Sequence, residues 1–64
     1  MDREQELWAA AHMLINRHGA DAWFHTAKRA DELSVQGDIE GHVIFVAILR
    51  RIERLNGPAE GALN

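Results

Sequence analysis

Histidine is the residue type in this chain best suited to chemistry, because imidazole binds metal ions and transfers protons near neutral pH. The sequence contains His12, His18, His25 and His42. Two histidines share one face of a helix when they lie three or four residues apart, and no pair here has that spacing. A metal site would need ligands from several helices, so we expect solvated or helix-terminal histidines and no bound metal.

Candidates for a catalytic nucleophile are few, because Ser34 is the only serine and the chain has no cysteine. The motifs Gly-x-Ser-x-Gly and His-Glu-x-x-His and the glycine-rich phosphate-binding loop are all missing from the sequence. A chain of 64 residues also has little volume for a closed pocket of about 300 Å³ or more. We therefore predict a protein that is not an enzyme, with no cofactor and no small-molecule substrate.

The chain is small and acidic. Its 64 residues are 47% apolar and 27% charged, and the formal net charge is −3. A domain of this size lies close to the lower limit for independent folding, and without cysteine no disulfide can stabilise it.

The negative net charge gives no general attraction to phosphates or anionic lipids. The acidic N-terminus does not resemble a signal peptide, and the longest apolar run, residues 43–49, is too short to span a membrane. We therefore expect a cytoplasmic location and no membrane contact.

Apolar residues recur at spacings of three and four, and glycines separate the segments with this pattern, so we predict three helices. Asp2 is placed to cap the first helix, which ends at Gly19, and the second covers about residues 20–36. Gly37 ends the second helix and Asp38 opens the third. The pattern predicts an all-α fold, a small three-helix bundle with short glycine-containing connections. We expect residues 1–57 to form a single domain and residues 58–64 to form a flexible C-terminal tail.

Each predicted helix has an apolar face directed toward a shared core. The residues assigned to these faces are Leu7, Ala11, Leu14 and Ile15 in the first helix, Trp23, Ala27, Ala30 and Leu33 in the second, and Gly41, Ile44, Phe45, Ile48, Ile52 and Leu55 in the third. The second helix has few large side chains on this face. We therefore expect a core that is small for a domain folding alone.

Two of the predicted helices carry apolar residues outside these faces. They are Ala9 and Met13 in the first helix and Val43, Val46 and Ala47 in the third. Such residues are either ordinary exposed side chains at the edge of the bundle or a surface for association. With Arg50 and Arg54 as a polar rim they form a candidate interface, which the small size of the domain favours. We expect a small non-catalytic protein-interaction module that forms a homodimer or binds another protein.

Nucleic-acid binding is the alternative function, because three short helices with a tight turn before the third resemble a helix-turn-helix. The first half of the third helix would have to enter the groove. Residues 39–43 include an acid and no Arg, Lys, Asn or Gln to contact bases or phosphates. Direct binding is therefore disfavoured, and the alternative is a small regulatory protein associated with nucleic acid.

Several short motifs resemble those of one family. They are the run Arg3-Glu4-Gln5-Glu6-Leu7-Trp8-Ala9, the His18-Gly19 helix end, the Ala27-x-Arg29 step, the Gly37-Asp38 junction and the apolar series Phe45, Ile48, Ile52 and Leu55. Over residues 2–56 the chain is similar to short alphaproteobacterial helical proteins grouped as a domain of unknown function. The resemblance implies a compact helical protein of the bacterial cytoplasm with no assigned activity, so no catalytic residue is transferred. Ala30 is smaller than the aliphatic residues expected there in the family.

Overall fold

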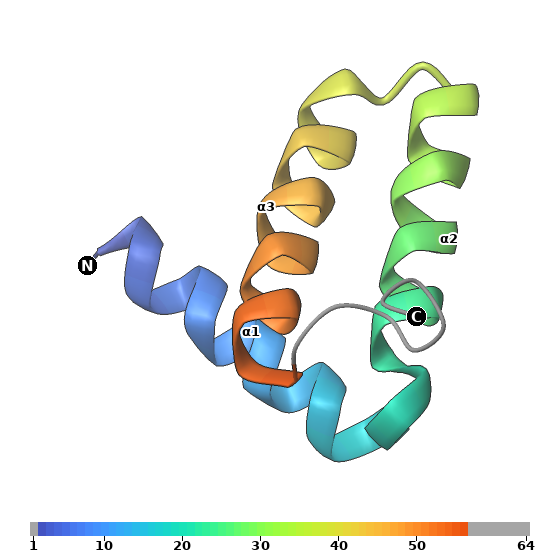
Figure 1. Ribbon diagram of the computed structural model, residues 1–64. Helices are drawn as coiled ribbons and strands as arrows, with labels where there is room; N and C mark the ends of the chain where they lie inside the picture. Colours follow the sequence, from blue (N-terminus) through green and yellow to red (C-terminus); the bar gives the residue numbers. More distant parts are fainter. Residues whose placement is uncertain (1, 57–64) are drawn as a thin grey trace.

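The computed structural model describes residues 2–56 of the chain. Of these residues 93% are helical and none belongs to a strand, so the prediction of an all-α fold is confirmed. The elements in chain order are α1 (Arg3–His18), a 3₁₀ turn η1 (Gly19–Asp21), α2 (Ala22–Val35) and α3 (Ile39–Asn56) (Figure 1). None of these helices has both the length and the apolar character required to cross a membrane.

The predicted caps of α1 and α3 are confirmed. The Asp2 carboxylate accepts a hydrogen bond from the amide of Glu4 at 3.2 Å, and the Asp38 carboxylate accepts one from the amide of Gly41 at 2.9 Å. Each bond satisfies an amide that has no partner within its own helix. Gly41 lies beside this cap and not deep in the core, where the sequence pattern placed it. A Cβ atom on Gly41 would lie 2.5 Å from Oδ2 of Asp38.

The prediction of three helices separated by glycine connections is wrong for the first connection. Gly19 ends α1 with a φ of 58°, and its amide donates to the carbonyl of Ile15. Gly19 itself has non-helical backbone angles, but no loop follows it, because η1 begins at this residue and the amide of Ala22 donates to the carbonyl of Gly19. Glycine bends the helix without a polar loop to interrupt it. The described residues therefore form two uninterrupted helical runs, 3–35 and 39–56.

The second connection is a tight turn, and it reverses the chain as predicted. Gly37 has a φ of 85°, and the amide of Asp38 donates to the carbonyl of Leu33 at 2.8 Å. In Figure 1, α2 and α3 run side by side in opposite directions, and α1 crosses beside the C-terminal half of α3. α3 packs most extensively against α2 and next against α1. The predicted tail, residues 58–64, lies outside the described residues.

The core lies where the three helices meet. It consists of the buried residues Ala11, Leu14, Ala22, Ile48 and Ile52, with Leu7, Ala10, Ile15, Trp23 and Ile44 packed against them. All four residues predicted for the first helix contribute to it, as do Ile44, Ile48 and Ile52 of the third. Phe45 is half-buried outside this cluster, and Leu55 is 40% exposed at the end of α3.

The buried face of α2 agrees with the predicted one at Ala30 and Leu33 and differs from it in the first two turns. We expected Trp23 and Ala27 to point inward, yet both are only half-buried, whereas Ala22 and Thr26 are completely buried. The buried residues Ala22, Thr26, Ala30 and Leu33 follow one another at intervals of four, four and three, so the face begins one residue earlier than predicted in the first two turns. Small residues at 22, 26 and 30 allow the backbone of α2 to come close to its neighbours, and the bulkier Trp23 lies at the edge.

Candidate functional site

The side of α3 that faces away from the core carries an apolar and charged surface. We call it the outer face of α3 and define it by Ile39, Glu40, Val43, Val46, Ala47, Arg50 and Arg54. Helical residues turn by about 100° each, so Val43, nine residues before Ile52, points in the direction opposite to this core residue. Ile52 is completely buried, and Val43 is 59% exposed. One helix therefore has a buried apolar side and an exposed apolar side.

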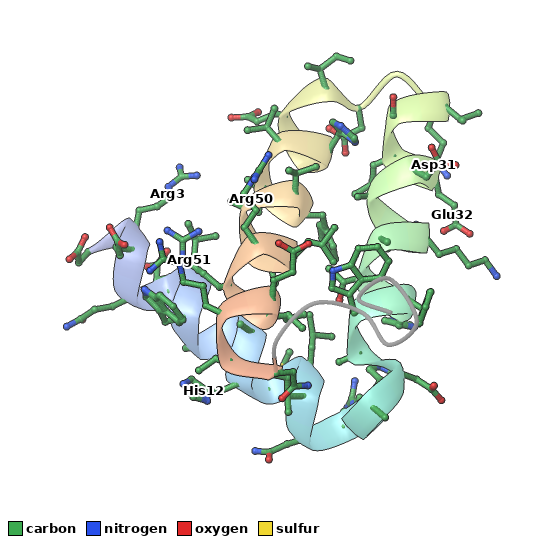
Figure 2. The ribbon with its side chains drawn as sticks, viewed as in Figure 1. Arg3, His12, Asp31, Glu32, Arg50 and Arg51 are labelled. Atoms are coloured by element: carbon green, nitrogen blue, oxygen red, sulfur yellow. The ribbon has the colours of Figure 1, made fainter. Side chains whose placement is uncertain are left out.

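Five of the seven predicted interface residues lie on this outer face. Val43, Arg50 and Arg54 are exposed, and Val46 and Ala47 are half-buried. In Figure 2, Arg50 lies on α3 while its neighbour Arg51 extends toward α1. Arg51 is a packing residue: its guanidinium lies 5.5 Å from the centre of the Trp8 ring and donates to the carbonyl of Ala47 at 2.8 Å. The outer face is therefore adjacent to, and distinct from, the side of α3 that contacts α1.

The other two predicted residues, Ala9 and Met13, are exposed on α1. α1 approaches Arg51 with Glu4, whose carboxylate lies 3.4 Å from the guanidinium. Met13 follows Glu4 by nine residues and therefore lies on the opposite side of α1. Met13 is thus directed away from the α3 residues and does not share a surface with them. Sequence periodicity defines which residues share a face within one helix, but it does not orient that helix against another.

Two residues of the outer face were not part of the predicted interface. Ile39 is 64% exposed, and it continues the apolar line one turn before Val43. Glu40 is exposed and lies three residues before Val43. The spacing of four between Ile39 and Val43 is present in the sequence and is the signal that could have identified Ile39.

Charge is distributed unequally along the outer face. Glu40 lies in the first turn of α3, whereas Arg50 and Arg54 lie near its C-terminal end. Glu40 in the first turn and Arg54 in the last turn agree with the helix dipole, which favours acids at the start of a helix and cations at its end. The ion pairs within the described residues are Arg29–Glu32 and Arg51–Glu4. None of the three charged groups of the outer face takes part in them.

Comparison with known proteins assigns the chain to a family. A family model described as "Family of unknown function (DUF6961)" matches residues 3–60. The chain belongs to this family. The match covers α1, α2 and α3 completely, and it agrees with the resemblance to a domain of unknown function. No curated protein and no solved structure matches the chain.

The histidines of this family member lie at several separate places. His12 is exposed on α1, and His18 and His25 stack with ring centres 3.9 Å apart across η1. Nδ1 of His42 lies 2.7 Å from the carbonyl oxygen of Ala30 and so links α3 to α2. Within residues 2–56, no three side chains of the metal-ligating types are close enough to hold an ion. Three of the four histidines thus make contacts inside the fold.

Proposed function

We propose that this protein is a small non-catalytic protein-binding module whose binding surface is the outer face of α3. One observation carries the proposal: Ile39 and Val43 are 64% and 59% exposed on consecutive turns, on the side opposite the buried Ile52. Single exposed apolar residues are normal on proteins. An apolar line with charged residues at its ends, on the helix that holds the core together, has the composition of an interaction site.

The physical gain from covering this surface is substantial for so small a domain. Fully burying a valine or isoleucine side chain contributes about 1.5 to 3 kcal/mol, and more than half of Ile39 and of Val43 is still accessible. Ala47 is small, which allows a partner helix to approach the α3 backbone closely. Arg50 has an aliphatic stem that can cover apolar surface while its guanidinium stays in water.

The alternative, a small regulatory protein associated with nucleic acid, has weaker support. Arg50 and Arg54 are exposed one turn apart and could contact phosphate. Glu40 on the same face and the net charge of −3 oppose such binding. The proposal includes no cofactor and no reaction. A location in the bacterial cytoplasm is part of the proposal, supported by the sequence pattern and by the family resemblance.

Site-specific crosslinking tests the proposed binding surface. A photoreactive amino acid replaces Val43 in the full chain, and the matched control carries it at Lys28, an exposed position on α2. We expect a protein adduct of defined mass at position 43 after irradiation in the producing cell, and none at position 28. Equal labelling at both positions, or none at 43, would contradict the proposal. An adduct to nucleic acid at position 43 would favour the alternative.

A further inference from the structure

We infer that the partner on the outer face of α3 is a second copy of this chain, with the two α3 helices packed antiparallel about a two-fold axis. This inference rests on the proposed function, because it uses the same surface. It adds the identity of the occupant and the orientation of the two helices. The spacing of the residues on the outer face and the placement of their charges support this arrangement.

The spacing first defines a straight strip along α3. Glu40, Val43, Ala47, Arg50 and Arg54 follow one another at intervals of three, four, three and four residues. This alternation is the repeat by which one helix keeps a continuous line of contact with another. Glu40, Val43, Arg50 and Arg54 are exposed, and Ala47 in the middle is half-buried. The strip is therefore accessible along most of its length.

Ala47 is the natural crossing point of the two helices. It lies seven residues from Glu40 in one direction and seven from Arg54 in the other. A two-fold axis close to Ala47 therefore places Glu40 of each copy beside Arg54 of the other. It also places Val43 near the aliphatic stem of Arg50 of the other copy. Ala47 has the smallest side chain of the strip, so the backbones can approach most closely where they cross.

Charge selects this orientation over the parallel one. In the antiparallel arrangement, two Glu40–Arg54 ion pairs form between the copies. A parallel arrangement would instead place Glu40 against Glu40 and Arg54 against Arg54. Like charges directly opposite one another cost free energy, whereas ion pairs at a rim mainly fix orientation and contribute little affinity. The chain is thus complementary to itself in one orientation only.

The apolar part of the strip supplies the attraction. Ile39 and Val46, seven residues apart, lie on the same side of the strip and widen its apolar centre beside Val43. A contact through one helix from each copy buries less than the roughly 1,200 Å² of a standard stable interface. We therefore expect a dimer that dissociates on dilution.

Sedimentation equilibrium of charge-reversal variants tests the inference. Glu40→Arg alone and Arg54→Glu alone replace both ion pairs by like charges, so each variant should dimerise at least about tenfold more weakly than wild type. An equimolar mixture of the two variants restores both ion pairs, and it should form a heterodimer of near wild-type affinity. Asp31→Arg and Lys28→Glu make the same charge changes at exposed positions on α2 and should leave the association unchanged.

The double variant Glu40→Arg/Arg54→Glu guards against a folding artefact. A cation in the first turn of α3 opposes the helix dipole. Glu40→Arg carries this cost both alone and in combination with Arg54→Glu. The double variant exchanges the ion pairs and should dimerise, with helicity confirmed by circular dichroism. A mixture that associates no better than its components, or a wild type that stays monomeric at all concentrations, overturns the inference. If the inference fails in this way and Val43 still crosslinks to a different protein, the outer face of α3 binds that protein and not a second copy of the chain.

Discussion

The indole Nε1 of Trp23 donates a hydrogen bond to Oε2 of Glu53 at 2.9 Å, joining the start of α2 to the last turns of α3. The two residues are thirty positions apart in the chain, and both are half-buried. A second polar contact, between Nδ1 of His42 and the carbonyl oxygen of Ala30, lies farther along the same pair of helices at 2.7 Å. These two contacts fix the register of α3 against α2, and with it the direction in which the outer face points.

The bond from Trp23 predicts a specific loss when its acceptor is removed. Glu53→Ala should lower the free energy of unfolding by about 1 to 2 kcal/mol, because a half-buried indole N–H loses a charged acceptor. Glu53→Gln keeps a carbonyl acceptor and should lose less. Urea unfolding followed by circular dichroism measures both values. Equal losses in the two variants would show that the hydrogen bond contributes nothing measurable.

Thr26 provides a case in which a substitution should stabilise the protein. Its side chain is completely buried, and Oγ1 has no hydrogen-bond partner within the described residues. Thr26→Val replaces the hydroxyl by a methyl group of similar size, so the free energy of unfolding should rise by about 1 kcal/mol. Thr26→Ser keeps the hydroxyl and removes the methyl group, and it should be destabilising. A drop in the thermal unfolding midpoint of Thr26→Val would contradict this account.

Arg51 and Glu4 form an ion pair whose two members should differ in importance. The side chain of Arg51 is 19% exposed and that of Glu4 is 63% exposed, with 3.4 Å between them. Glu4→Gln should change the free energy of unfolding by less than about 0.5 kcal/mol, because exposed ion pairs contribute little. Arg51→Ala should cost about 1 to 2 kcal/mol, because it removes the contact with Trp8 and the hydrogen bond to Ala47. Denaturant titration measures the loss of stability in both variants. Equal losses would show that the ion pair contributes more than expected and would contradict this prediction.

Gly37 should resist substitution for a conformational reason. Its φ of 85° lies in a region that residues with a Cβ atom rarely adopt, and no atom within 4 Å would obstruct the Cβ itself. Gly37→Ala should therefore lower the free energy of unfolding by about 1 to 2 kcal/mol through backbone strain. Gly37→Asn should cost less, because asparagine tolerates positive φ better. Chemical denaturation measures the free energy of unfolding of both variants. A smaller loss for Gly37→Ala than for Gly37→Asn would contradict this prediction.

Local features of this fold could be predicted from the sequence. Asp2 and Asp38 cap their helices because a short acidic side chain reaches the next free amides, whatever the rest of the chain does. Gly37 ends α2 for an equally local reason, its positive φ. Ile48 and Ile52 were assigned to the core correctly, since the long apolar face of α3 leaves little ambiguity.

Features that depend on contacts between helices could not be predicted in this way. Thr26 is buried and Trp23 is half-buried because of the side that α2 turns toward its neighbours, and this rotation is set by contacts between helices. Met13 and Val43 were assigned to one interface, but the crossing of α1 against α3 keeps them apart. The direct passage from α1 into α2 was also missed, because glycine is compatible with both a loop and a bend.

The most direct test of the account is the concentration dependence of molar mass for wild type and Val43→Glu, measured by sedimentation equilibrium. Val43→Glu places a charge in the centre of the outer face without touching the core, and Lys28→Glu on α2 is the matched control. We predict that wild type and Lys28→Glu shift from monomer to dimer as concentration rises, while Val43→Glu remains monomeric and equally helical. A wild type that never exceeds the monomer mass, or a Val43→Glu variant that dimerises like wild type, would contradict self-association through the outer face of α3.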